Sequence, residues 1–394
     1  MTASVRTRRN ALFVLFFLPG IVISSWVTRT PDIRDATQAS TAEMGLIIAG
    51  LSVGSMLGVL SGGPLVARLG ARRVSLAGVS LVAAGCAVIG VGGGLGIGPV
   101  VALGLGLFGL GVGAAEIGLN VEGGEVERGI GRSTLPMLHG AYSLGTVVGA
   151  AVGVGLTAIR FPVLVHLVVA AAIVAVALVF AIRPMPADIG IQPRRSADDT
   201  QAPRPQVWRD PRLLLIGFVV LALGMAEGTA NDWLPLLMVD GHGLEAALAS
   251  GSFALFAITM TIGRFAGGWF VDRFGKAAVL GVSAAIGAVG IGLVSFVDDP
   301  VVAVASVVLW GLGAALGFPV ALSAAGESGP NSAARVSLAA SIGYIAFLVG
   351  PPLLGFLGEA YGLRGAILVV LALVALAIAA TTGIRPAHTV RARG

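Results

Sequence analysis

The sequence predicts an all-α membrane protein of twelve transmembrane helices, arranged as two pseudo-symmetric six-helix bundles. Three observations lead to this prediction. Hydrophobic residues make up 56% of the 394 residues and charged residues only 11%, whereas a soluble domain carries roughly 25% charge. Twelve apolar runs are long enough to cross a bilayer, which takes about 20 residues each. In addition, a tract in the first half of the chain returns in the second half.

The apolar runs fall into two groups of six, separated by a polar stretch. The predicted spans are residues 11–29, 43–66, 74–94, 99–121, 134–158, 161–182, 213–238, 247–270, 277–297, 301–325, 336–358 and 363–383. The stretch between the groups is rich in Pro, Arg, Asp and Gln, a composition typical of a disordered or surface linker. We therefore predict an N-terminal bundle over 1–182, a cytoplasmic linker over 183–212 and a C-terminal bundle over 213–394.

Basic residues set the predicted orientation. With the N-terminus inside, all but four of the 25 lysine and arginine residues fall in inner segments; the exceptions are Arg29, Arg34, Arg160 and Arg364. Cytoplasmic loops carry this excess, so both termini are predicted to be cytoplasmic. The first run continues without a small-residue cleavage site, which indicates an uncleaved span rather than a signal peptide. The basic residues lie at the ends of apolar runs and not on one polar face, which argues against nucleic-acid binding.

The repeat aligns the tract GGPLVARLGARRV, after the second span, with GGWFVDRFGKAAV, after the eighth. Gly62 then matches Gly267, an offset of 205 residues. At a nearby offset, Tyr142 of the fifth span aligns with Tyr344 of the eleventh. Repeated halves around a central site are common in secondary transporters. The repeat predicts a pseudo-twofold axis along the membrane normal.

The first tract, with Arg68 and Arg72 at its basic positions, resembles G-x-L-x-D-R-x-G-R-R, the cytoplasmic signature of the major facilitator superfamily. The second copy keeps the aspartate as Asp272, followed by Arg273, whereas the first copy has Ala67 at that position. In the family this aspartate helps to hold neighbouring helices in one conformation. The resemblance thus implies a latch at Asp272 and no equivalent pair in the first half.

Further segments resemble the MosC-like branch of that superfamily, which is named for a rhizopine transport protein. These segments are SSWVTRTPDIR, GLNVEGGEVERGIGRSTLPMLHGAYSLG, AEGTANDWLPLLM, GFPVALSAAG and GYIAFLVGPPLLGF. The branch is similar to sugar permeases of the fucose type. The resemblance therefore implies proton-coupled uptake of small sugars or polyols, and it is specific for the subfamily rather than for the substrate.

Two acids lie deep in apolar spans, each with an amide one turn away. Glu116 precedes Asn120, and Glu227 precedes Asn231, which is followed by Asp232. An ionisable group inside a bilayer costs roughly 2.5–3.5 kcal/mol on insertion scales, so each one needs an explanation. Such an acid can be tied structurally to a helix end or to an arginine. We favour solute binding and proton transfer, because burial favours the neutral acid and an amide both donates and accepts hydrogen bonds.

Several other residues are candidates for the same cavity. Trp26 and Arg29, near the outer end of the first span, are either an interfacial anchor or, as the W-x-x-R-x-P pattern of the branch implies, part of the cavity lining. His139 and Tyr142 lie about one turn apart on the fifth span, where histidine either relays protons or packs between helices. We expect Tyr344, at the corresponding place in the eleventh span, to line the cavity.

Charged residues near the cytoplasmic ends form a predicted inner gate. After the fourth span, two arginines stand among Glu122, Glu125 and Glu127. This cluster is either a solvated loop or a set of ion pairs that break when the inside opens, and we favour the gate. With the signature residues, the predicted gate comprises Arg68, Arg72, Asp272, Arg273, Glu127, Arg128 and Arg132.

The leading hypothesis is a monomeric secondary active transporter of a bacterial inner membrane that moves a small polar organic solute by alternating access. Proton-coupled uptake is favoured over its alternative, drug or metabolite efflux by proton antiport, because the fifth span lacks the antiporter proline. A non-transporting sensor or scaffold is disfavoured because no added soluble domain is expected. No catalytic set, metal-ligand cluster or nucleotide-binding context predicts an enzyme, a metal site or a cofactor.

We expect Asp272→Asn to slow transport more than it weakens solute binding, because a latch biases a conformational equilibrium without touching the solute. Initial rates in proteoliposomes and equilibrium binding to the purified protein measure these two effects separately. Equal rates for the Asp272→Asn and parent proteins would contradict the latch.

Overall fold

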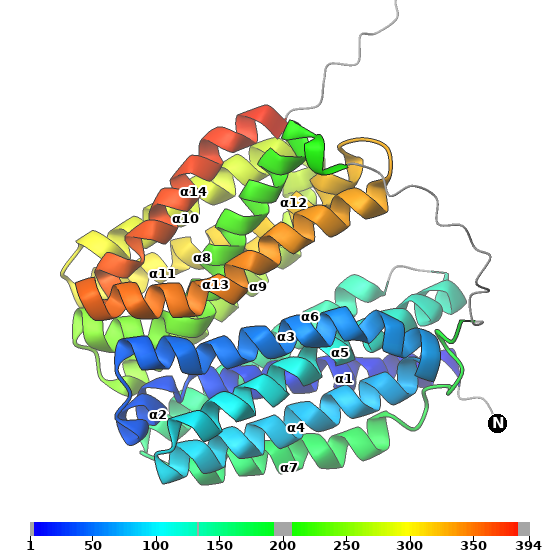
Figure 1. Ribbon diagram of the computed structural model, residues 1–394, viewed down its shortest axis with the longest axis horizontal. Coiled ribbons are helices and arrows are strands. Elements are labelled where there is room, and N and C mark those ends of the chain that lie inside the picture. Colours follow the sequence, from blue (N-terminus) through cyan, green and yellow to red (C-terminus); the bar gives the residue numbers. More distant parts are fainter. Residues whose placement is uncertain (1–3, 132–133, 193–206, 385–394) are drawn as a thin grey trace, which may run out of the picture. The chain divides into compact units, whose positions relative to one another are not determined.

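The computed structural model describes residues 4–131, 134–192 and 207–384, and all regular structure within these ranges is helical (Figure 1). Eleven helical segments in the described ranges are long and apolar enough to cross a membrane, if the broken run Pro300–Glu327 is counted as one, and α14 is a shorter apolar helix. The predicted fold class is confirmed. In chain order the helices are α1 (Val5–Val27), α2 (Thr30–Thr37), α3 (Thr41–Leu69), α4 (Ala71–Leu95), α5 (Gly98–Ile130), α6 (Leu135–Ala158), α7 (Val163–Ala181), α8 (Pro211–His242), α9 (Ala246–Phe274), α10 (Lys276–Phe296), α11 (Pro300–Ala315), α12 (Gly317–Glu327), α13 (Ser332–Ala366) and α14 (Leu368–Thr381).

Three differences between the helices and the predicted spans stand out. The tenth span is divided into α11 and α12 at Leu316, because Pro319 has no N–H to donate to the carbonyl of Ala315. The short helix α2 was not predicted, since its mean hydropathy is too low for a span; Pro31 stands in its first turn, where proline is tolerated. Helix α5 extends to Ile130, about nine residues or two and a half turns beyond the predicted end of the fourth span.

The repeat is visible in the backbone. Helices α3 and α9 are both 29 residues long, and each is followed by a glycine with positive φ, namely 87° at Gly70 and 78° at Gly275. A side chain with a Cβ rarely adopts such a conformation, so glycine is required for the sharp turn into α4 and α10. The two copies of the signature therefore form the same helix–turn–helix structure.

The chain forms two compact units. Unit 1 comprises Met1–Ala197, Asn231–Ala257 and Pro351–Leu363, and unit 2 comprises Asp198–Ala230, Ile258–Gly350 and Arg364–Gly394. Unit 1 thus includes α1 to α7 together with parts of α8, α9 and α13. The division into bundles at 183–212 remains a prediction, because these units follow contacts and not the order of the chain.

Small residues bring the helices of unit 1 close together. Helix α4 packs against α5 and α7, α3 packs against α5, and α1 packs against α6 (Figure 1). A Cβ on Gly78 of α4 would lie 2.7 Å from the backbone nitrogen of Ala115 in α5. Lipid tails are as apolar as leucine, so such close van der Waals packing is a main source of helix association in membranes.

Unit 2 is held by the packing of α10 against α11 and α14 and by a polar contact at the start of α8. Arg335, which is only 7% exposed, donates to Asp210 and to the hydroxyl of Ser328, at 2.6 Å for the latter. The hydrogen bond from Arg335 lowers the pKa of Asp210. This contact ties the beginning of α13 to the beginning of α8.

The first part of the predicted linker is packed onto unit 1. The backbone N–H of Ala71 donates to Ile189 O (2.8 Å), and that of Gln192 donates to Ala67 O (3.0 Å). Ile189 also packs on a cluster made of Val66, Ala71, Val74 and Ala114. This segment contacts the last turn of α3 at Ala67, where the signature lacks its aspartate, and the start of α4 at Ala71. Residues 193–206 of the linker lie outside the described ranges.

We expect Gly190→Val to destabilise unit 1 by about 1–3 kcal/mol, the usual cost of overpacking. Gly190 has φ 83°, and a Cβ there would lie 2.6 Å from Val66 Cγ1. The melting temperature of the purified protein in detergent measures the effect. Gly124→Ala is the matched control, since a Cβ at Gly124 meets nothing within 4 Å. An unchanged melting temperature for Gly190→Val would show that the segment is not docked.

Candidate functional site

Glu116 is an exposed residue in the apolar part of α5. Among the described residues, its carboxylate has no hydrogen-bond or ion-pair partner. One turn further along α5, Asn120 Oδ1 lies 3.1 Å from His139 Nε2 of α6. An amide oxygen can only accept, so His139 donates through Nε2 in this contact. Three of the predicted residues thus form a polar group on neighbouring helices of unit 1.

His139 is held in place by an aromatic neighbour as well. Its ring lies 5.1 Å from that of Phe16 in α1, at an interplanar angle of 67°, which is an edge-to-face arrangement. Tyr142 follows three residues later on α6 and is half-buried. The predicted pair of His139 and Tyr142 therefore lies where α6 packs against α1.

Glu227 of α8, in unit 2, is paired and not free. Arg264 of α9 donates from Nη2 to Glu227 Oε1 at 2.7 Å, and the two side chains are 31% and 13% exposed respectively. The Nε of Arg264 also donates to the backbone oxygen of Ala315 at 3.4 Å. Sequence reasoning missed Arg264 as a site residue, although a single arginine within the apolar run 247–270 was the available signal.

The break between α11 and α12 explains why Arg264 contacts Ala315. In a continuous helix the oxygen of Ala315 would accept from the residue four positions later, but that residue is Pro319. The carbonyl is therefore left without its helical donor, and Arg264 takes the vacant position. One guanidinium joins α8, α9 and the broken helix.

The other predicted residues of α8 lie in the stretch that belongs to unit 1. Asn231 and Asp232 are half-buried, and neither side chain has a polar partner in the described part of the chain. The indole N–H of the neighbouring Trp233 is buried and has no acceptor there either. Pro235 removes the helical donor for the Asn231 carbonyl. This stretch thus combines an uncompensated acid with a free backbone acceptor.

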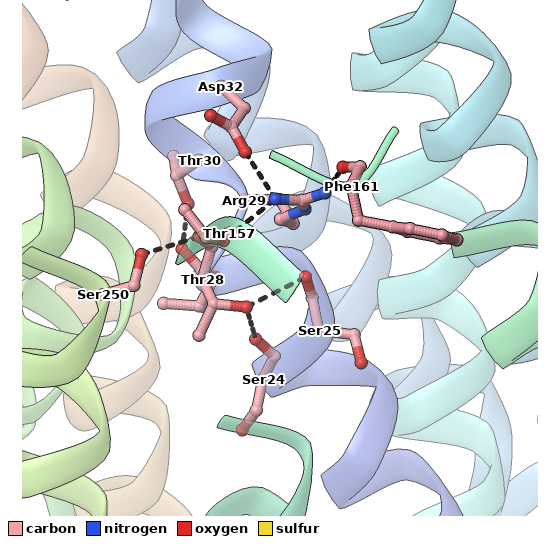
Figure 2. Close-up of polar contacts among 10 residues, drawn as sticks. Ser24, Ser25, Thr28, Arg29, Thr30, Asp32, Thr157, Phe161 and Ser250 are labelled. Carbon is pink, nitrogen blue, oxygen red and sulfur yellow. Dashed lines mark hydrogen bonds and ion pairs between the residues drawn. The ribbon is translucent and has the colours of Figure 1, made fainter. Parts of the chain in front are cut away.

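Trp26 and Arg29 are enclosed within unit 1, at 2% and 0% exposure. Figure 2 shows the Arg29 guanidinium among three acceptors: Asp32 Oδ2 at 2.8 Å, Thr157 Oγ1 at 2.9 Å and the backbone oxygen of Phe161. Burial raises the pKa of the Asp32 carboxyl, and the Arg29 charge partly offsets this. Trp26 is therefore not a surface anchor, and Arg29 holds the end of α1 against α6 and α7.

Unit 1 also contains contacts that the sequence did not predict, between N-terminal helices and the ends of α8, α9 and α13. Arg34 forms an ion pair with Asp240, and Ser250 Oγ donates to Thr28 O at 2.7 Å (Figure 2). The backbone N–H of Ala42 donates to Glu359. In the predicted orientation these contacts lie at the outer ends of the helices.

The predicted gate cluster after the fourth span is helical, not a loop, because α5 continues to Ile130. Glu127 Oε2 accepts from the backbone N–H groups of Thr134 (2.7 Å) and Leu135 (3.0 Å), so it caps the start of α6. Arg128 pairs with Glu125 at an exposed position, where such pairs contribute little.

Glu122 has a separate structural role, since it is fully buried and accepts from Arg8 Nε at 2.7 Å. This pair joins the start of α1 to α5. Of the other predicted gate residues, Arg132 lies outside the described ranges. Arg68, Asp272 and Arg273 are exposed and Arg72 is half-buried, and none of these four has a polar partner among the described residues.

Tyr344 of α13 belongs to an aromatic group in unit 2, which we define as Phe318, Tyr344 and Phe347. The ring of Phe318 lies 6.4 Å from Tyr344 and 6.0 Å from Phe347, in edge-to-face arrangements. All three side chains are half-buried. Phe318 is the second residue of α12, so this aromatic group adjoins the helix break.

Comparison with known proteins places this architecture among transporters. The sequence profile of the Major Facilitator Superfamily matches residues 11–346. An uncharacterized transporter of this type from Yersinia pestis is 28% identical over 349 residues, which cover 87% of each chain. The membrane protein MosC of Rhizobium meliloti is 23% identical over 372 residues, which cover 92% of this chain and 86% of MosC. The predicted resemblance is confirmed.

Solved structures agree at the level of the fold. A mutant of the nucleoside transporter NupG superposes with a TM-score of 0.80 at 15% identity, covering 96% of this chain and all of that one. A D-xylose-proton symporter gives 0.75 at 14% identity, with coverage of 97% and 98%. The fucose:proton symporter of E. coli gives 0.65 at 17% identity, with coverage of 96% and 98%.

We expect Glu127→Ala to lower the stability of the protein by about 1–2 kcal/mol, the usual cost of removing a helix cap. Thermal unfolding in detergent measures the change. Glu125→Ala removes a carboxylate two residues away that pairs only at the surface, so it serves as the control and should leave the melting temperature nearly unchanged. Equal effects of the two substitutions would exclude the capping role.

Proposed function

The chain belongs to the Major Facilitator Superfamily, and on that premise we propose that it takes up a small polar organic solute, of the sugar or polyol kind, together with protons. The protein is a many-span membrane protein with bacterial homologues. Our proposal adds that it acts as a monomer in the bacterial inner membrane, with both termini in the cytoplasm. Transport proceeds by alternating access between two conformations.

The observation that carries the proposal is the unpaired carboxylate of Glu116. In an apolar span an ionised and unpaired acid is costly, whereas the protonated acid is neutral and can donate a hydrogen bond. A proton bound at Glu116 therefore stabilises whichever conformation encloses this side chain more fully. Because a ligand shifts a conformational equilibrium by its differential affinity for the two states, this provides the coupling.

Asn120 and His139 extend the same group. Their hydrogen bond joins the His139 imidazole of α6 to Asn120, which lies one helical turn from Glu116 on α5. Histidine titrates near neutral pH, so it can pass a proton between the cytoplasm and an acid. We assign His139 to proton relay and the amide of Asn120 to its orientation.

The two acids take different parts in this proposal. The charge of Glu227 is balanced by Arg264 at 2.7 Å, whereas Glu116 has no such partner among the described residues. An acid that keeps an ion-pair partner is a poorer proton carrier than a free one. We therefore assign proton coupling to Glu116 and solute contact to Glu227. Asn231, one turn further along α8, and the adjacent Asp232 are further candidates for solute contact.

The names of related proteins support uptake. Two of the structural neighbours are proton symporters, for fucose and for D-xylose, and a third is a nucleoside transporter. All three solutes carry several hydroxyl groups. The contacts Arg34–Asp240 and Ser250–Thr28 would act as the outer closure. The signature residues near the cytoplasm would act as the inner one, namely Arg68, Arg72, Asp272 and Arg273.

We expect Glu116→Gln to abolish accumulation driven by a pH gradient while preserving exchange of labelled for unlabelled solute, because glutamine mimics the protonated acid. Proteoliposomes with an imposed pH gradient, screened with sugars, polyols and nucleosides, measure both activities. Glu245→Gln alters an exposed acid and serves as the control.

Full gradient-driven accumulation by Glu116→Gln would exclude this residue as the coupling site. If the parent protein accumulates solute only when the imposed pH gradient is reversed, the result would indicate efflux by proton antiport. Either result would overturn the corresponding part of the proposal.

A further inference from the structure

We propose that Arg264 determines solute specificity and that, with Glu227 and the aromatic group, it binds a neutral ring bearing vicinal hydroxyls. The proposal rests on the proposed function, since it names the class of solute that such a transporter would carry. It is built entirely from residues of unit 2.

Arg264 has unused donors on a partly exposed side chain. A guanidinium carries five N–H bonds. One of these, at Nε, points to Ala315 O, and one at Nη2 points to Glu227. The remaining three have no acceptor among the described residues, and the side chain is 31% exposed. A solute that arrives at this guanidinium therefore finds donors without displacing a protein contact.

Glu227 offers the complementary groups. Its Oε1 accepts from Arg264, whereas no described residue donates to its Oε2. The site thus presents spare donors and a spare acceptor next to each other. The charges of the pair cancel, so the site has no net charge to attract an anion or a cation.

The pair is held in a fixed position from two sides. Glu227 holds one end of the guanidinium, and the carbonyl of Ala315, left without a donor by Pro319, holds the other. A planar guanidinium fixed at two points presents its remaining N–H bonds in a defined direction. Such preorganisation reduces the entropy lost when a solute binds.

The aromatic group lies next to this pair. Phe318 is three residues from Ala315, the residue whose carbonyl Arg264 contacts. On the other side, Gly228 follows Glu227 on α8, and a Cβ at Gly228 would lie 3.0 Å from Cδ1 of Phe347. The absence of a side chain at Gly228 therefore lets the Phe347 ring approach α8 beside Glu227.

These features together fit a ring of carbon atoms with adjacent hydroxyls. Each hydroxyl both donates and accepts, so neighbouring hydroxyls can accept from Arg264 and donate to Glu227 at the same time. The C–H faces of such a ring are apolar and can pack on half-buried aromatic rings. A carboxylate solute would meet the charge of Glu227, and an ammonium solute would meet that of Arg264.

The test is solute binding to the purified full-length protein. Binding is measured as a shift of the melting temperature and, independently, by calorimetry. The probes are myo-inositol, L-fucose, D-xylose and uridine. Cyclohexanol and 2′,3′-dideoxyuridine are the analogues that lack vicinal hydroxyls. We expect at least one probe to bind and its analogue to bind at least about tenfold more weakly, as expected when charge-assisted hydrogen bonds are lost.

The variants are Arg264→Lys, Arg264→Gln and Glu227→Gln. Lysine keeps the positive charge and the ion pair but not the planar fork, so it tests recognition even if Arg264→Gln fails to fold. We expect Arg264→Lys to raise the Kd about tenfold or more. Arg160→Gln removes an exposed arginine and should leave the Kd unchanged.

A Kd for Arg264→Lys within twofold of the parent value would overturn the proposal, as would binding of the analogues alone or of none of the probes. Failure of the proposed function gives a different result. Binding that depends on Arg264 without gradient-driven uptake would reject proton-coupled transport and leave this site standing. Gradient-driven uptake together with an unchanged Kd for Arg264→Lys would reject this site and leave proton-coupled transport standing.

Discussion

Lipid provides no hydrogen-bond partner for a backbone, so the protein itself has to satisfy the N–H and C=O groups within its spans. A helix does this internally except at its ends and opposite proline. In this protein, side chains of other helices donate to several of the backbone carbonyls that lack a helical partner. Ser250 donates to the carbonyl of Thr28 beyond the end of α1, and Arg264 donates to Ala315 opposite Pro319. Each break in one helix thus fixes the position of a second helix.

The same constraint places the charged groups. Glu127 serves α6 by accepting from its first N–H groups, and the Arg29 guanidinium closes the turn before α7 through the Phe161 carbonyl. These side chains look like gate or cavity residues in the sequence, but their contacts are those of structural caps and ties. Glu116 is different, because none of the described residues uses its carboxylate. A charge without a structural partner is a better indicator of transport chemistry than depth in a span alone.

The sequence predicted the helices well because bilayer thickness fixes the length of a span, and hydropathy reads that length directly. The prediction missed the break at Leu316. Pro319 lies in an apolar run, and hydropathy contains no information on the backbone N–H that proline lacks. The neighbouring positions of Glu116 and Asn120 follow from helical periodicity within one segment. The sequence did not reveal the partner of Glu227, because Arg264 is 37 residues away. Their contact depends on how α8 and α9 are rotated relative to each other.

The ion pair between Arg8 and Glu122 has a consequence for synthesis. Arg8 leaves the ribosome more than a hundred residues before Glu122, so during that interval Glu122 cannot pair with it. In the predicted orientation the charge of Arg8 would then help to retain the N-terminus on the cytoplasmic side. When α5 inserts, Glu122 neutralises the same guanidinium and becomes enclosed. The topogenic signal is thereby converted into a tertiary contact. A nascent chain halted before α5 is therefore more strongly basic at its N-terminus than the finished protein.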